Sequence, residues 1–372
     1  MNSSSNIRIG NLFGIPFFIN PSWFLVLGLI TLSYGGELAR FPQLTGLTPW
    51  ILGLVAALLL FASVLAHELG HSFAAISQGI EVKSITLFIF GGLAALEKES
   101  ETPGESLLVA IAGPLVSVLL FGIFTLINFT VSLPTPLSAI VSLLASINLV
   151  LALFNMIPGL PLDGGNVLKA IVWKATGNPH KGIIIAGRVG QFFGWLAVGF
   201  GILGILNILP FGSFWTLLIG WFLLQNAGFA AQSATVQDKL DGLTAEDAVI
   251  ADSPIVEANL TIRDFVNQYV IGKQQWRKFL VVDEAKHLIG EVFVDDLKQV
   301  PTSEWIYVPL AKLVKPVSEF TQIAADLSLL EVVKLIETQN VKEMVVVKGD
   351  REVLGLLEKA SIANLLQKET QS

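Results

Sequence analysis

The sequence contains no cysteine among its 372 residues. This absence excludes disulfide bonds, thiolate metal ligands and thiolate nucleophiles. Charge is also scarce, because only 14% of the residues are charged while 53% are hydrophobic. Such a composition is too apolar for one ordinary soluble domain. Part of the chain is therefore expected to lie in a lipid bilayer.

The few charges are unevenly distributed along the chain. Residues 1–237 hold 8 basic and 8 acidic residues, whereas residues 238–372 hold 15 basic and 22 acidic residues. The formal net charge of −7 therefore belongs to the C-terminal third. This pattern is typical of a soluble, acidic region and argues against nucleic-acid binding. The N-terminus lacks the order of residues found in a signal peptide, so we expect none to be removed.

Six apolar segments approach the roughly 20 residues that a helix needs to cross a bilayer. They are 17–35, 49–77, 107–131, 137–157, 183–209 and 213–232. An even number of spans places both termini on one side. The face that carries the termini has six basic residues in its tail and loops, whereas the other face has only Arg40. The positive-inside tendency then predicts cytosolic termini in a multi-pass protein of a bacterial cell membrane or a plastid-type membrane.

Residues 85–96, "ITLFIFGGLAAL", form a shorter apolar stretch that favours β-structure. It is too short to span a bilayer and is interrupted by Gly91 and Gly92. Open strand edges are not tolerated against lipid. We therefore expect a re-entrant β-hairpin that lines a cavity.

The C-terminal third contains an internal repeat. "FLVVDEAKHLIG" (279–290) aligns with "MVVVKGDREVLG" (344–355) at an offset of 65 residues, and an amphipathic helical pattern precedes each copy. The pattern predicts two copies of one α/β unit.

The second apolar segment contains "HELGH", in which His67 and His71 stand four residues apart. Side chains at this spacing share one face of a helix, so both imidazoles can bind one metal ion with Glu68 beside them. Ionisable residues inside a membrane span are costly and indicate function. The alternative is that the histidines are polar packing residues in a helix bundle.

A catalytic zinc site needs a third protein ligand. The candidate is Asp163, which is the only acidic residue between Glu105 and Asp238. If the second span runs toward the cytosol, the fourth does too, so their ends meet at the same depth. A cap or turn residue before Gly164 is the alternative role for Asp163.

These motifs, together with "FGGLA" (90–94), "AGPL" (112–115) and "FNMIPGLPLDGG" (154–165), resemble those of the site-2 protease family of intramembrane zinc metalloproteases. The C-terminal repeat resembles a pair of CBS domains. The expected fold is therefore a polytopic α-helical membrane protein of about six transmembrane helices with a short re-entrant β-hairpin, followed by a cytosolic α/β CBS pair. Its expected domains are a transmembrane zinc protease domain (1–237) and two CBS domains (238–305 and 306–372).

The resemblance implies one zinc ion per chain, with His67, His71 and Asp163 as ligands and Glu68 as general base. Asn155 would stabilise the oxyanion, although an asparagine near a span end can equally bond a neighbouring helix. It also implies that the hairpin, with bare backbone at Gly91 and Gly92, pairs with an unwound transmembrane substrate. Two alternatives are a membrane zinc transporter, which would not need Glu68, and a catalytically silent scaffold.

CBS pairs commonly bind adenine nucleotides through a Gly, a hydroxyl three residues on and an Asp six residues on. Gly290 and Asp296 fit this spacing, but Phe293 occupies the hydroxyl position. In the second repeat Gly355 is followed by Glu358 and Ser361. We therefore expect at most one nucleotide site, built around Asp296 and weak for ATP, or a CBS pair that only mediates homodimerisation or coupling to the membrane domain.

Overall fold

The computed structural model describes residues 6–89, 91–272, 276–315, 322–349 and 352–368. The chain divides into two compact units, Met1–Thr235 and Val236–Ser372. Each is described by itself.

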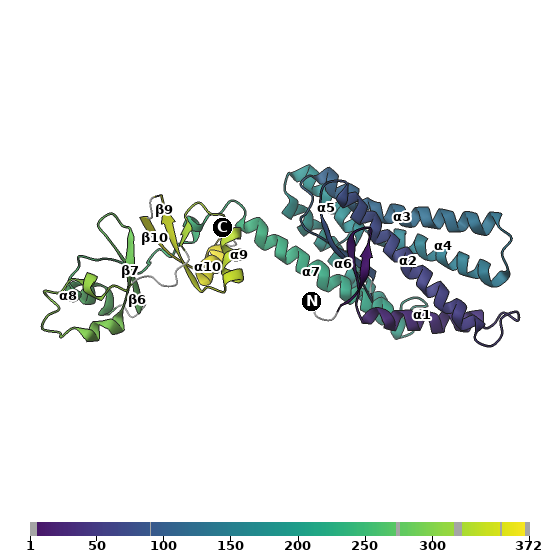
Figure 1. The fold of residues 1–372 in the computed structure, drawn as a ribbon, viewed down its shortest axis with the longest axis horizontal. Coiled ribbons are helices and arrows are strands. Elements are labelled where there is room, and N and C mark those ends of the chain that lie inside the picture. The colour runs from purple at the N-terminus through teal and green to yellow at the C-terminus, as the bar shows by residue number, and fades with distance from the viewer. Residues whose placement is uncertain (1–5, 90, 273–275, 316–321, 350–351, 369–372) are drawn as a thin grey trace. The chain divides into compact units, whose positions relative to one another are not determined.

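The N-terminal unit is built mainly from long apolar helices (Figure 1). Among the described residues, five helices are long and apolar enough to cross a membrane. They are α2 Thr48–Ile76, α3 Pro103–Thr130, α4 Thr135–Asn155, α6 Pro179–Ile205 and α7 Phe214–Leu240. The first predicted span is a shorter apolar helix, α1 Ser22–Leu38, of 17 residues. At about 1.5 Å per residue it covers about 26 Å of a core roughly 30 Å thick.

A further helix occupies a segment that the sequence alone predicts to be a loop. Helix α5, Asp163–Thr176, follows α4 after a short turn and ends at Gly177, whose φ of 73° caps the helix in the left-handed conformation. Lys169 of this helix forms an ion pair with Glu99, in which Nζ lies 2.6 Å from Oε2. The helix has only 14 residues, which is too short for a membrane span, so its apolar residues give no transmembrane signal.

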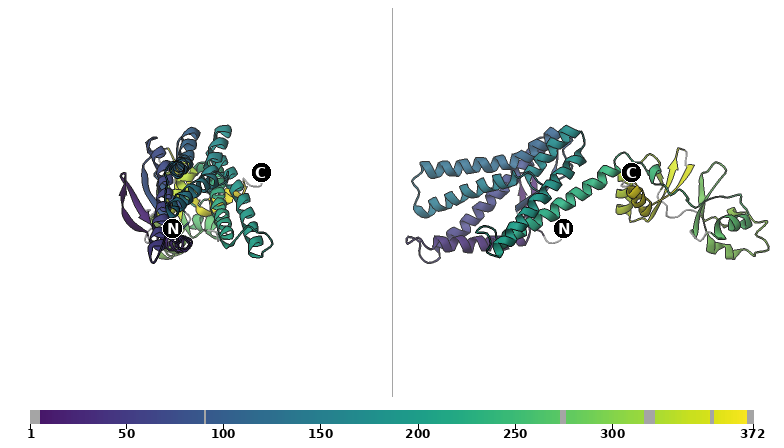
Figure 2. Two further views of the ribbon diagram at one scale, coloured as in Figure 1. Left: turned by 90° about the vertical axis from the view of Figure 1, so that its right-hand side faces the viewer. Right: turned by 180° about the vertical axis from the view of Figure 1, so that it is seen from behind.

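A four-stranded sheet, β1-β2-β3-β4, packs beside the helices (Figure 2). Its strands are β1 Ile7–Leu12, β2 Ile15–Ile19, β3 Val82–Phe88 and β4 Gly91–Leu96. The expected hairpin is thus present as β3 and β4, but it belongs to a larger sheet. The expected N-terminal tail instead forms the β1–β2 hairpin, closed by Phe13 and Gly14 at φ 51° and 85°.

The sheet is fixed to helix α2 by a small apolar core. Ile15 of β2, Val82 and Ile85 of β3 and Ala75 of α2 are all buried in it. Strand β2 runs parallel to β3, and β3 runs antiparallel to β4. Strand β4 is therefore an edge strand, and it lies against α2, the helix that carries the two histidines.

The C-terminal unit contains the predicted repeat. The first copy comprises β5 Ile255–Glu257, α8 Ile262–Phe265, β6 Lys278–Val282 and β7 Leu288–Phe293. The second comprises β8 Gln322–Ala324, α9 Leu329–Gln339, β9 Glu343–Lys348, β10 Glu352–Glu358 and α10 Lys359–Lys368. Each copy has one three-stranded sheet, in the orders β5-β6-β7 and β10-β9-β8.

Equivalent residues of the two copies contact each other. His287 forms a β-bridge with Glu352, and Lys278 forms an ion pair with Glu343; both pairs are 65 positions apart, the offset of the repeat. Each copy also takes part of its core from outside its own repeat. Ala245 and Ala248 pack in the core of the second copy, and Leu310 and Leu313 pack in that of the first. The two copies are therefore interlocked rather than merely adjacent in sequence.

Candidate metal centre

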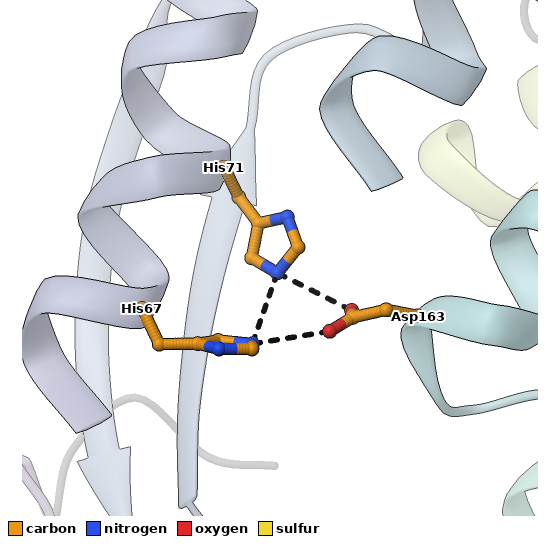
Figure 3. A group of neighbouring side chains, drawn as sticks. All are labelled: His67, His71 and Asp163. Atoms are coloured by element: carbon orange, nitrogen blue, oxygen red, sulfur yellow. Dashed lines mark hydrogen bonds and ion pairs between the residues drawn. The ribbon is translucent and has the colours of Figure 1, made fainter. Parts of the chain in front are cut away.

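Three predicted ligands lie together at one end of α2 (Figure 3). His67 and His71 project from one face of α2 toward Asp163, the first residue of α5. Among the described residues, these three side chains form a group whose potential ligand atoms all lie within 4.8 Å of one another. The three side chains therefore lie close together, as we predicted from the spacing of the histidines and the order of the spans.

The distances within this group suit a small cation. Nε2 of His67 lies 3.0 Å from Oδ2 of Asp163, and Nε2 of His71 lies 3.3 Å from Oδ1. The two Nε2 atoms are 3.3 Å apart. Tetrahedral zinc with bonds of about 2.0–2.2 Å holds its ligand atoms roughly 3.3–3.6 Å apart, so the spacing is close to that of a zinc site.

In each imidazole, the ring nitrogen that faces away from Asp163, Nδ1, already has a polar contact. Nδ1 of His71 donates to the carbonyl of Val109 at 2.7 Å, which leaves a lone pair on Nε2 of the neutral ring. Nδ1 of His67 lies 2.8 Å from Oγ of Ser117. The Nε2 atoms of both histidines and a carboxylate thus converge in a largely buried position, an arrangement that a bound cation would stabilise.

Two residues of α3 support this arrangement and were not found from the sequence as site residues. Ser117 is fully buried against His67. At Gly113, within the "AGPL" motif, a Cβ atom would lie 2.2 Å from Nε2 of His71, so only glycine leaves room for the ring. The sequence feature that could have identified these two residues is a serine and a glycine one helical turn apart in an apolar helix.

Two glycines allow Asp163 to reach the histidines. A Cβ at Gly164 would lie 2.4 Å from the carbonyl oxygen of Met156, and one at Gly165 would lie 2.3 Å from the carbonyl carbon of Gly159. Because neither has a side chain, the start of α5 packs directly on the preceding turn. The N-terminus of a helix also favours a carboxylate through its dipole. The two glycines that follow Asp163 therefore form a tight turn and also leave the Asp163 carboxylate beside the histidines.

Asn155 is the last residue of α4 and lies at the same centre. Its amide nitrogen is 3.3 Å from Nε2 of His67. The bundle contains a separate buried asparagine, Asn148, which donates to Ser63 of α2 at 3.1 Å. The contact of Asn155 with His67 also joins α4 to α2, so Asn155 both makes an interhelical contact and lies beside His67.

The carboxyl group of Glu68 lies against strand β4. A Cβ at Gly92 would lie 2.3 Å from Cγ and 2.9 Å from Oε1 of Glu68. A Cβ at Gly91 would meet no heavy atom within 4 Å, but Gly91 adopts φ 135°, a conformation that favours glycine. Phe90, the first residue of "FGGLA", lies outside the described residues.

Asp296 lies in the C-terminal unit and is buried. Its Oδ1 accepts hydrogen bonds from Nζ of Lys315 at 2.6 Å and from Nε2 of Gln299 at 3.1 Å. Its Oδ2 has no hydrogen-bond partner among the described residues. Nζ of Lys315 also lies 5.5 Å from the ring centroid of Phe293. The carboxylate that was expected to bind ribose is thus already paired with a lysine.

Comparison with known proteins places this centre in context. The profile of peptidase family M50 matches residues 55–141 and 122–196. The Synechocystis sp. protein sll0528, whose name assigns it to the zinc metalloproteases, is 62% identical over 98% of this chain and 96% of its own length. Among solved structures, a site-2 protease from Methanocaldococcus jannaschii matches 61% of this chain and 95% of its own, with 27% identity and a TM-score of 0.45. A CBS domain-containing protein from Kribbella flavida matches 34% of this chain and 98% of its own, with 16% identity and a TM-score of 0.28.

Proposed function

This chain belongs to peptidase family M50, the site-2 proteases, and we propose that it hydrolyses peptide bonds within or near the transmembrane segments of other membrane proteins. It is a zinc metalloprotease and an integral membrane protein. The observation that carries the proposal is the convergence of His67, His71 and Asp163 beside Glu68. A zinc transporter would have no need of a carboxylate held next to the ligands.

His67, His71 and Asp163 would hold one zinc ion per chain. The separations of 3.0–3.3 Å between their facing atoms support this assignment, as do the contacts that occupy both Nδ1 atoms. When bound, zinc supplies Lewis-acid chemistry and makes a neighbouring water molecule more acidic. Ser117 and the carbonyl of Val109 fix the orientation of the two rings.

Glu68 acts as the general base and Asn155 as the donor to the oxyanion. The Glu68 carboxylate takes a proton from the attacking water molecule and passes it to the leaving amine of the scissile bond. The Asn155 side-chain N–H, 3.3 Å from a ring nitrogen of His67, is close enough to the ligands to donate to the carbonyl oxygen as it gains charge.

The substrate binds as an extended strand on the open edge of β4. A helical transmembrane segment has its carbonyl groups engaged in hydrogen bonds, so it must unwind before attack. Strand β4 offers a free edge directly beside Glu68, with the backbone bare at Gly91 and Gly92. The edge at β1 lies three strands away from this carboxylate. This arrangement supports β4 as the edge that receives substrate.

The charge distribution supports the orientation that we propose for the chain. The excess of basic residues in the tail and loops of one face supports cytosolic termini in a bacterial cell membrane or a plastid-type membrane. The acidic C-terminal unit would then be a cytosolic CBS pair that regulates cleavage and is able to form a homodimer. The proposed domain division is 1–237, 238–305 and 306–372.

Co-expression with single-span membrane proteins tests the proposal. Wild type should cut at least one such protein within or near its span, whereas Glu68→Gln should leave the same protein uncut. Immunoblotting of both fragments measures cleavage, and zinc transport measured in parallel provides the comparison with a transporter. Zinc uptake that survives Glu68→Gln, without cleavage by wild type, would contradict the protease assignment.

A further inference from the structure

Helices α6 and α7 carry four polar side chains in their membrane-spanning parts. On α6, Arg188 and Gln191 are three residues apart, and on α7, Gln225 and Gln232 are seven apart, so each pair shares one face of its helix. Gln191 lies near the middle of α6, Pro179–Ile205. All four side chains are exposed or half-buried. Within the described part of the chain, none of the four has a hydrogen-bond or ion-pair partner.

The two polar faces lie on the same side of the helix pair. A Cβ on Gly228 would lie 3.0 Å from Nε2 of Gln191. Gly228 is three residues after Gln225 and four before Gln232, so the Gln191 amide lies over α7 between these two glutamines. Arg188 is one helical turn from Gln191. The four residues, which we call the polar belt, are therefore gathered within about one turn of a single depth in the membrane.

The opposite side of α6 packs on the turn that precedes Asp163. Leu160 N–H donates a hydrogen bond to the carbonyl of Ala186 at 3.1 Å, and a Cβ on Gly190 would lie 2.1 Å from the carbonyl oxygen of Leu160. Arg188 is two residues from both Ala186 and Gly190, which is about 200° around a helix. The polar belt therefore faces away from the turn that leads to the metal centre.

Lipid hydrocarbon does not supply the hydrogen-bond partners that these side chains lack, whereas another membrane helix can. A second copy of the chain, related by a two-fold axis along the membrane normal, presents the same belt at the same depth. Each glutamine amide has both donors and an acceptor, so two identical belts are complementary. The amide oxygens of one copy can also accept hydrogen bonds from Arg188 of the other. A partner of different sequence would need polar residues of its own at this depth.

We propose that the polar belt of α6 and α7 is a docking surface for a second copy of this chain, in a parallel dimer whose glutamine amides form hydrogen bonds across the two-fold axis. Because the belt faces away from the turn before Asp163, the dimer leaves the metal centre of each copy uncovered. The inference does not depend on proteolytic activity or on any contact made by the C-terminal unit.

Energy transfer between labelled copies tests the docking surface. The chain contains no cysteine, so a single one introduced at Thr45, which is exposed between α1 and α2, carries the donor or the acceptor dye. The full-length protein is reconstituted in phosphatidylcholine vesicles over a range of lipid-to-protein ratios. Transfer should exceed the level for randomly distributed molecules and fall on dilution with lipid. Transfer no greater than the random level would overturn the proposal and leave the belt to lipid or to a different membrane protein.

Replacing the amides tests the belt itself. Changing Gln191, Gln225 and Gln232 together to leucine should raise the dissociation constant about tenfold or more, the effect of losing a few hydrogen bonds between membrane helices. Asn226→Leu is the matched control, because Asn226 is exposed beside Gln225 but its Nδ2 donates to the carbonyl of Phe222 in its own helix at 2.8 Å. An unchanged constant in the triple variant, or an equal rise in Asn226→Leu, would overturn the proposal.

Crosslinking keeps the test decisive even if the triple variant fails to fold. Trp195 is four residues after Gln191 on the same face of α6 and is 67% exposed, and Leu119 of α3 is 62% exposed. A flexible bis-maleimide should join two copies of Trp195→Cys in the membrane but not two copies of Leu119→Cys. Any other pattern would overturn the proposal. The proposed proteolytic function fails separately, through intact substrate with zinc-loaded wild type, and that result would leave the association data unaffected.

Discussion

Two glycines leave the space that the side chains of His71 and Glu68 occupy. Gly113 lies under the ring of His71, and Gly92 lies under the carboxyl group of Glu68. The resemblance to the site-2 proteases implied a role for Gly92 in leaving bare backbone for substrate. The structure adds a more local reason, because a Cβ atom there would lie 2.3 Å from Cγ of Glu68.

We predict that Gly92→Ala lowers cleavage about 100-fold, the effect expected when a catalytic group is displaced by about 1 Å. Zinc content should stay at the wild-type level, because Gly92 contacts none of the three ligands. Cleavage rate and metal content are measured on the same purified protein.

Gly10→Ala is the matched control, since Gly10 lies in β1 of the same sheet and a Cβ there meets no atom within 4 Å. Wild-type cleavage by Gly92→Ala would show that the Glu68 carboxyl group is not confined by β4. Replacing Gly91 is less informative, because its φ of 135° makes any substitution strained whatever its neighbours.

The long helices and the C-terminal repeat could be predicted because each rests on a regular pattern. Apolar runs of 20 residues or more identify α2, α3, α4, α6 and α7, and an offset of 65 residues identifies the repeat. The β1–β2 hairpin and α5 were not predicted, because both are short and lie beside apolar segments. Ser117 and Gly113 were missed as site residues for a different reason: their roles depend on contacts between helices that no local pattern encodes.

Helix α1 decides on which side the N-terminus lies. Five spans separate residue 45 from the C-terminus whether or not α1 crosses, so these two positions are predicted to lie on opposite sides. Only a crossing by α1 also places the N-terminus opposite residue 45. We therefore predict that reporter fusions at the N-terminus and at residue 372 give the same signal, opposite to a fusion at residue 45.

Matching signals at residues 45 and 372 would contradict the five long spans. Matching signals at the N-terminus and residue 45 would show instead that α1 lies on the membrane surface. The second result would leave the proposed metal centre unaffected, since His67 and His71 belong to α2 and Asp163 belongs to α5.

At the scale of the whole molecule, the charges of the C-terminal unit affect its predicted binding of nucleotides. The ion pair with Lys315 occupies Oδ1 of Asp296 and leaves only the buried Oδ2 for a ribose, whereas Lys315 itself could attract a phosphate. The acidic character of the whole unit opposes a highly charged ligand. These effects favour weak binding, with adenosine and AMP bound better than ATP.

We predict that calorimetric titration of the full-length protein gives at most one adenine-nucleotide site per chain, and that Asp296→Ala abolishes it. Asp295→Ala is the matched control, because the Asp295 carboxylate is exposed and pairs with Lys298. Tight ATP binding that persists in Asp296→Ala would place any nucleotide site elsewhere.

The content of zinc in purified variants tests the proposed centre most directly. Wild type and Glu68→Gln should each retain one zinc ion per chain, whereas Asp163→Ala should lose most of its metal, because a site with three protein ligands depends on each of them. Metal analysis of the three proteins, purified side by side from the same medium, gives the result. Full zinc occupancy in Asp163→Ala would remove Asp163 from the centre and contradict the convergence of α2 and α5 on one metal ion.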